Sequence, residues 1–318
     1  DGSDGEDGAD GEDGEDLTRY GTVYYCSSAS EVQEAIDSIG TGDGTIIIVQ
    51  DIILDAPIEI DQGGNLIIEG IHSTTIHLGG DWAAFNITRS RCVIRDLNIN
   101  ATEITIGGRS IIEINEDHDK YVEISDVNIE AAYNGNGIRI YSDNVLIKNC
   151  YIDRCYMAIR LGPDCQNVKI KDNELHNSDY ANVWLDGSNN VLESNYLSNP
   201  QGETVIHIYE SNSNNSMIIN NKIDAYGSWG IQGATENNLY SGNYIHSFEF
   251  KTSTRSGIDI SSTNASITDN VIIGFMGADE YGIKLTGDYP LVVGNYVIDC
   301  TYNFTASATA IEYGNSWN

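Results

Sequence analysis

Basic residues are scarce in this chain. Its 318 residues include 16 Lys and Arg against 48 Asp and Glu, so the formal net charge is −32. Nucleic-acid binders and proteins adsorbed to anionic membranes need clustered cations, and the composition excludes both classes. No apolar run approaches the roughly 18 residues that a spanning helix needs, so we expect no insertion into a membrane.

Proline and closely spaced cysteine pairs are also rare. Four prolines suit a sheet protein whose backbone N–H groups are nearly all used in hydrogen bonds between strands. The six cysteines include no C-x-x-C pair, which argues against a structural zinc site. Cys150, Cys155 and Cys165 fall close together, so a disulfide among them and buried free thiols are the two alternatives.

The acidic residues are concentrated at the start of the chain. Nine of them lie in residues 1–16, where Gly and Asp each recur at every third position. Three interpretations stay open: a disordered tail, a calcium-binding loop and a collagen-like stalk. The sequence requires no cofactor, and calcium is the one candidate, with Asp4, Asp7, Asp10 and Asp13 as its ligands.

Residues 17–44 are expected to form a first strand and a short capping helix. Ser30 and Gln33 have the spacing of a capping box at the start of the helix, and Gly40 is a suitable residue to end it. Apolar residues recur at helical spacing between them: Val32, Ala35, Ile36 and Ile39. No other helix is predicted after Gly40.

Residues 45–318 consist of short β-branched runs that repeat at intervals of 21 to 28 residues. One column of apolar-x-apolar triplets starts at Ile58, Phe85, Ile112, Ile138, Ile159, Val183, Ile206, Ile231, Ile258, Ile283 and Ile311. A second column places Asp or Asn before a strand, at Asp96, Asp126, Asn149, Asn173, Asn195, Asn221, Asn243, Asn270 and Asn295. Because no helices intervene, the repeat predicts an all-β solenoid of about eleven rungs.

The repeated text, such as GIRIYSDNVLIKNCYI and GIDISSTNASITDNVI, resembles the right-handed parallel β-helix superfamily of pectin-lyase-like and NosD-type repeat proteins. The resemblance covers about residues 45–318 and implies a right-handed parallel β-helix capped by an N-terminal helix. It does not imply one activity, because many functions share this fold. In such a coil Ile138 and Ile140 point inward and Arg139 points outward. Asn at the turns tolerates left-handed geometry and can hydrogen-bond from rung to rung.

Alternation along the strands predicts one outward patch on this acidic body. It comprises Arg139, Tyr141, Arg160, Trp184, Asp186, His207 and Tyr209. Aromatic faces can bind sugar rings and arginine can pair with uronate carboxylates, so this pattern predicts a polysaccharide site. Ordinary solvated residues on a sheet face are the alternative.

The same patch contains the candidates for catalysis: His207, Tyr209, Arg160 and Asp186. A lyase would use a base such as His207 or Tyr209 with charge neutralisation by arginine. A hydrolase needs two carboxylates, and the rung spacing places Asp186 and Asp259 roughly 14 Å apart, which is too far. Enzymatic activity is left open, and a role without catalysis is favoured.

Sequons at Asn86, Asn100, Asn214, Asn264 and Asn303 permit N-glycosylation of a surface protein. The last rung, placed at Ile311–Tyr313, has no cap of its own, so we expect self-assembly through it. The first hypothesis is therefore an extracellular structural subunit of a cell-surface sheath, surface layer, filament or virion fibre. The second is a β-helix that binds a polysaccharide or degrades one as a lyase.

Overall fold

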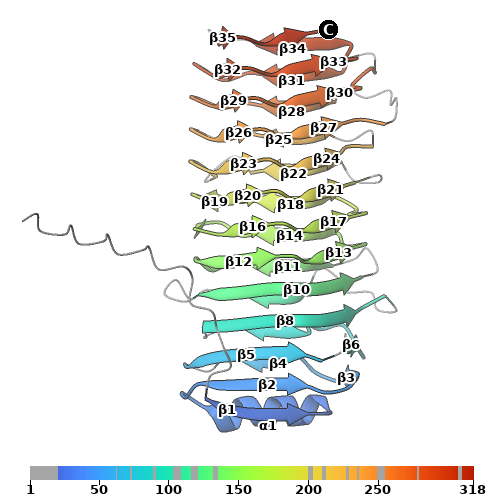
Figure 1. The fold of residues 1–318 in the computed structure, drawn as a ribbon, viewed down its shortest axis with the longest axis vertical. Helices are drawn as coiled ribbons and strands as arrows, with labels where there is room; N and C mark the ends of the chain where they lie inside the picture. The colour runs from blue at the N-terminus through green and yellow to red at the C-terminus, as the bar shows by residue number, and fades with distance from the viewer. Residues whose placement is uncertain are drawn as a thin grey trace, which may run out of the picture.

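The computed structural model of the chain is a parallel β-solenoid whose strands stack along one axis (Figure 1). It describes residues 21–318 except for 62, 72–73, 89–90, 103–108, 116–120, 132–134, 200–202, 210–212, 227–228, 235, 249–254, 278 and 307–309. The proposed calcium ligands Asp4, Asp7, Asp10 and Asp13 lie outside the described residues.

One sheet of eleven parallel strands runs the length of the coil, one strand to each turn, which confirms the predicted number of rungs. Its strands are β4 (Ile58–Ile60), β7 (Phe85–Ile87), β9 (Ser110–Ile114), β11 (Asn136–Ile140), β14 (Met157–Leu161), β18 (Ala181–Leu185), β22 (Thr204–Ile208), β25 (Trp229–Gly233), β28 (Ser256–Ile260), β31 (Tyr281–Leu285) and β34 (Tyr302–Ala306).

The other large sheet has 23 strands in two columns that are joined through the long strands β8 (Arg91–Asn100) and β10 (Val122–Glu130). The first column also contains β1 (Thr22–Cys26), β2 (Gly44–Ile48), β5 (Asn65–Gly70), β12 (Val145–Lys148), β16 (Lys169–Lys171), β20 (Val191–Glu193), β23 (Met217–Ile219), β26 (Leu239–Ser241), β29 (Ser266–Thr268), β32 (Leu291–Val293) and β35 (Ile311–Tyr313).

The second column contains β3 (Ile52–Leu54), β6 (Thr75–Leu78), β13 (Tyr151–Asp153), β17 (Glu174–His176), β21 (Tyr196–Ser198), β24 (Lys222–Asp224), β27 (Tyr244–His246), β30 (Val271–Ile273), β33 (Tyr296–Ile298) and β36 (Ser316–Trp317). A separate pair is formed by β15 (Cys165–Gln166) and β19 (Gly187–Ser188). Each complete turn therefore passes through both columns and then the eleven-stranded sheet.

Aliphatic side chains stack in rows inside the coil. Ile231, Ile258 and Ile283 are paired one above the next and are fully buried, as the repeat predicts. Burying such a side chain stabilises the fold by about 1.5–3 kcal/mol. The last member of this row is Phe304, which pairs with Ile283, so the prediction that the row ends at Ile311 was wrong. Ile311 pairs with Leu291 in the first column, where the buried residue of the strand is the middle one, Val292.

The Asn/Asp column of the sequence combines two structural positions. Asp96, Asp126 and Asn149 have positive φ at the bend between the columns. From Asn173 onward the column lies one residue later than the residue with positive φ, and its asparagines are buried inside the bend. Their amides form a continuous ladder, in which Asn195 Nδ2 donates to Asn221 Oδ1 at 3.0 Å and Asn221 Nδ2 to Asn243 Oδ1 at 3.1 Å. The predicted rung-to-rung hydrogen bonds are thus present.

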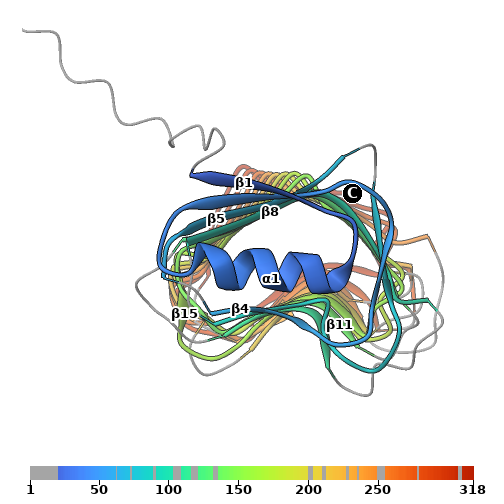
Figure 2. The same ribbon diagram turned by 90° about the horizontal axis from the view of Figure 1, so that it is seen from below.

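Helix α1 (Ala29–Ile39) lies across the first end of the coil (Figure 2). Its N-cap is Ser28, whose side chain accepts from the Glu31 N–H, so the predicted cap at Ser30 was wrong. Glu31 Oε2 accepts from the Ser27 N–H at 2.6 Å, so Glu31 takes the role in the capping box that was predicted for Gln33. The helix buries Val32, Ala35 and Ile36 against the coil.

All six cysteines are free thiols, which decides against a disulfide among Cys150, Cys155 and Cys165. At the opposite end of the coil from α1, Phe304 stacks on Trp317 with ring centroids 5.3 Å apart. Ile311 and Tyr313 in that turn are 49% and 67% exposed. Self-assembly through this turn stays a prediction.

Candidate functional site

The eleven-stranded sheet presents one outward side chain from each turn in a continuous row. The register pairs Arg139 with Arg160, Arg160 with Trp184, and Trp184 with His207. The row comprises Glu59, Asn86, Glu113, Arg139, Arg160, Trp184, His207, Gln232, Asp259 and Lys284. These are the residues that alternation predicts. The final position belongs to Thr305 instead of Glu312, because of the misplaced last rung.

Aromatic rings form an unbroken cluster across the middle of this sheet. Trp184 stacks on His207 with centroids 4.4 Å apart and an interplanar angle of 16°, and on Tyr209 at 5.3 Å. Tyr180 lies 5.6 Å from Trp184 and 5.7 Å from Tyr156. We call these five residues the aromatic platform. Tyr156 and Tyr209 are 42% and 43% exposed, so its two edges face solvent.

Sequence reasoning missed Tyr156 and Tyr180. Both precede their strands: Tyr156 comes just before Met157, and Tyr180 just before Ala181. Register pairs Met157 with Ala181, which places the two tyrosines one above the other at the edge of the sheet. The sequence does contain a signal, since each tyrosine stands three residues before its apolar triplet, outside the range that strand alternation covers.

Arg139 and Arg160 lie on adjacent turns next to the platform, and we call them the arginine pair. The Nε atom of each is buried and has no hydrogen-bond partner among the described residues. The guanidinium of Arg139 lies 4.4 Å from the ring centre of Tyr141. Burial lowers the pKa of Arg139, and the charge of Arg160 adds to this effect, while Glu113 opposes it. Because the two positive charges repel each other, binding of an anion from solution beside them would be favourable.

Asp186 borders the same cluster. It is 9% exposed, and its Oδ1 is buried without a hydrogen-bond partner in the described part of the chain. Burial raises the pKa of this carboxyl and so does the charge of Asp164, while Arg160 lowers it. Asp259, the other candidate for hydrolysis, lies three turns away and forms an ion pair with Lys284 at 3.0 Å. The structure does not bring these two carboxylates together.

A shallow hollow continues the sheet face beyond the arginine pair. It has a volume of about 380 Å³. Its lining includes Glu59, Asn86, Arg109, Glu113 and Arg139. The outward face therefore combines a hollow, a pair of cations and an aromatic surface in one continuous strip.

The remaining sequence predictions are placed as follows. Asn264 is exposed, and the other four sequon asparagines are partly buried: Asn86, Asn100, Asn214 and Asn303. Glycosylation of all five stays a prediction, as do the catalytic roles of His207 and Tyr209. Within the described residues, no group of three or more His, Cys, Asp or Glu is placed to hold a metal ion. No helix in this part of the chain is long and apolar enough to cross a membrane.

Residues 74–243 match the family described as the right handed beta helix region. The chain belongs to the right-handed β-helix family. No curated protein matches it. Its solved structural neighbours include the Dettilon tailspike protein, with 14% identity, a TM-score of 0.67 and coverage of 92% of this chain and 65% of the tailspike.

A second neighbour is a mutant tailspike of E. coli bacteriophage HK620 in complex with a hexasaccharide. It has 14% identity and a TM-score of 0.63, over 91% of this chain and 61% of that one. A third is the Azotobacter vinelandii mannuronan C-5 epimerase AlgE6 A-module, with 15% identity, a TM-score of 0.54 and coverage of 90% and 94%. The chain spans less than two thirds of the length of both tailspikes. At these identities the likeness shows the fold.

Proposed function

We propose that this β-helix protein binds an acidic polysaccharide along the outward face of its eleven-stranded sheet. The observation that carries the proposal is the aromatic platform directly beside the arginine pair. Sugar rings would lie against the exposed edges of the platform at Tyr156 and Tyr209, because His207 covers a face of Trp184. Arg139 and Arg160 would donate hydrogen bonds to carboxylates of the glycan. From Arg139 to His207 the site covers three rung intervals, or about 14 Å, which suits a chain of several sugars.

The charges also explain why such a site needs its two arginines. The protein is strongly acidic, so a polyanion is repelled everywhere except where cations are concentrated. At physiological ionic strength the screening length is about 8 Å, which weakens the distant repulsion and leaves direct contacts at the arginine pair in place. The saccharide bound by the phage HK620 tailspike and the mannuronan named for the epimerase support a glycan as ligand.

Affinity electrophoresis in gels containing polygalacturonate or alginate tests this proposal. We expect the wild-type protein to be retarded, and the double variant Arg139→Gln/Arg160→Gln to migrate freely. Trp184→Ala should weaken retardation about tenfold through the loss of stacking and packing. The charge-matched control Lys169→Gln/Lys171→Gln, on β16 of the other sheet, should bind as the wild type does. Equal retardation of both double variants, or no retardation of the wild type, would contradict the proposal.

A role as a fibre subunit at a virion or cell surface is a second candidate, supported by the likeness to two tailspikes. Such a role would agree with the extracellular location predicted from the sequence, which stays a prediction. Negative-stain microscopy of the purified protein would show regular polymers or trimers if this candidate is correct, and dispersed monomers if it is not.

A further inference from the structure

The second strand column carries an outward row of its own, on a different sheet from the aromatic platform. Its register runs from Asn128 to Tyr151, Glu174, Tyr196, Lys222, Tyr244, Val271 and Tyr296. Tyrosine occupies every second turn of this row, and we call these four side chains the tyrosine row. Two rung intervals separate successive tyrosines by about 9.6 Å.

The rings of the tyrosine row are held by side chains of neighbouring turns. His176 lies between Tyr151 and Tyr196, with ring centroids 5.3 and 5.2 Å away. The Tyr196 hydroxyl donates to Asp224 Oδ2 at 2.7 Å, and this bond, with burial, raises the pKa of Tyr196 to about 12. Lys222 Nζ lies 4.4 Å from the Tyr196 ring centre. Tyr244 and Tyr296 are 38% and 41% exposed, so their rings are accessible.

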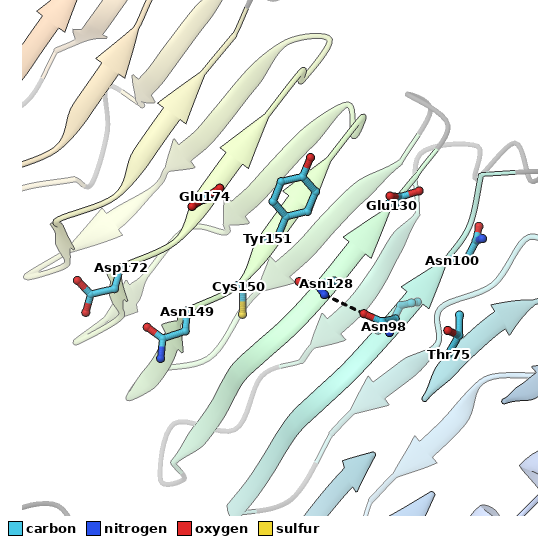
Figure 3. A pocket seen from close by; sticks show the side chains of 11 residues that line it. Thr75, Asn98, Asn100, Asn128, Glu130, Asn149, Cys150, Tyr151, Asp172 and Glu174 are labelled. Carbon is cyan, nitrogen blue, oxygen red and sulfur yellow. Dashed lines mark hydrogen bonds between the residues drawn. The ribbon is translucent and has the colours of Figure 1, made fainter. Parts of the chain in front are cut away.

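At its N-terminal end the row opens into a hollow on this surface (Figure 3). The hollow has a volume of about 770 Å³ and spans turns from β6 to β17. Asn98 and Asn128 lie in line with Tyr151, and Asn128 Nδ2 donates to Asn98 Oδ1 at 2.8 Å. Glu130, Asp172 and Glu174 also line the hollow. Arg154 forms an ion pair with Glu130 at 3.0 Å, so the negative charge of the lining rests on Asp172 and Glu174.

We propose that the tyrosine row and this hollow form a second site, which binds an extended, neutral glycan parallel to the coil axis. Two turns of the coil match the length of two sugar rings in an extended chain, so every second sugar would meet the next tyrosine of the row. The side-chain amides in the hollow can both donate hydrogen bonds to sugar hydroxyls and accept them, whereas carboxylates only accept and ammonium groups only donate. The carboxylates repel an acidic glycan, so the ligand class differs from that proposed for the eleven-stranded sheet.

At Tyr196 the ligand makes a different contact. Lys222 already covers one face of this ring, so a sugar hydroxyl would accept a hydrogen bond from the ammonium group instead of stacking. The stacking contacts are therefore those of Tyr151, Tyr244 and Tyr296. This site does not depend on the acidic-glycan proposal, because it shares no residue with the platform or the arginine pair.

The test is affinity electrophoresis of the whole chain in gels containing glucomannan or mixed-linkage glucan, both neutral and linear. We expect retardation of the wild type, weakened roughly fivefold by Tyr151→Ala and again by Tyr244→Ala. Tyr25→Ala, which removes an exposed tyrosine from β1, is the matched control and should leave retardation unchanged. Arg139→Gln/Arg160→Gln should also leave it unchanged, which separates this site from the other.

An exchange variant tests the spacing itself. Tyr244→Val combined with Val271→Tyr keeps the composition and the number of tyrosines, but moves one ring to the neighbouring turn. We expect it to bind as weakly as Tyr244→Ala. Wild-type retardation of the exchange variant, full retardation of the Tyr151→Ala/Tyr244→Ala double variant, or no retardation of the wild type by either neutral polysaccharide would overturn the proposal.

Discussion

Replacing Asn221 by alanine should destabilise the protein far more than an ordinary surface change, because this side chain connects three turns. Its Oδ1 accepts from Asn195 N and Asn195 Nδ2, both at 3.0 Å. Its Nδ2 donates to Leu192 O at 2.9 Å, Ile219 O at 3.0 Å and Asn243 Oδ1 at 3.1 Å. The residue is 1% exposed, so water does not replace these partners.

The magnitude follows from the number and burial of those bonds. A hydrogen bond contributes about 1 kcal/mol net, and a buried group left without a partner costs about 1–3 kcal/mol. Losing the Asn221 amide should therefore lower the free energy of unfolding by about 4 kcal/mol. Asn128→Ala is the control, since Asn128 is exposed and its Nδ2 donates to Asn98 Oδ1 at 2.8 Å. The cost of this change should stay below about 1 kcal/mol.

Urea unfolding followed by far-UV circular dichroism measures both variants. Hydrogen exchange read by mass spectrometry adds a local measurement, because the backbone amide of Asn195 loses its acceptor and should exchange faster in Asn221→Ala. If Asn221→Ala unfolds within about 1 kcal/mol of the wild type, or no more easily than Asn128→Ala, the ladder does not stabilise the coil as argued here.

Two further outcomes are expected. Burial raises the pKa of Cys92 to about 12, so this thiol should not react with a disulfide reagent at pH 8 in the native protein. In urea it should react fully. Rapid reaction of the native protein would contradict the placement of Cys92 in the core. The pKa of Asp186 is raised by burial and by Asp164, so its ionised form costs folding free energy at neutral pH, and this cost disappears as pH falls below the ordinary Asp value of about 4. Asp186→Asn should therefore raise the free energy of unfolding at pH 7 and leave it unchanged at pH 3. Equal effects at both pH values would rule out this cause.

The sequence predicted the solenoid because its two periodicities have direct structural causes. An inward side chain every second residue and one turn every 21 to 28 residues place Ile231, Ile258 and Ile283 in one row. The last rung was misplaced because Ile311–Tyr313 has the apolar-x-apolar pattern of the eleven-stranded sheet although its strand belongs to the first column. Ile311 and Phe304 both begin suitable triplets, and only the register distinguishes them.

The candidate site was predicted only as far as strand alternation reaches. Arg160, Trp184 and His207 are adjacent because they occupy equivalent strand positions. Tyr156 was missed because loop residues have no period. The tyrosine row did have a signal: Tyr196 and Tyr244 each follow directly after a ladder asparagine. The strand alternation that starts from the apolar triplets does not reach that position.

The two outward faces respond differently to a change in the length of the coil. Rings of the platform lie on consecutive turns, so gaining or losing any single turn elsewhere leaves their stacking intact. Tyrosines of the second column alternate, and inserting one turn between Tyr196 and Tyr244 would put them out of phase with a ligand whose repeat spans two turns. A longer version of this coil that keeps the spacing of both outward faces would therefore contain an even number of extra turns between Tyr196 and Tyr244.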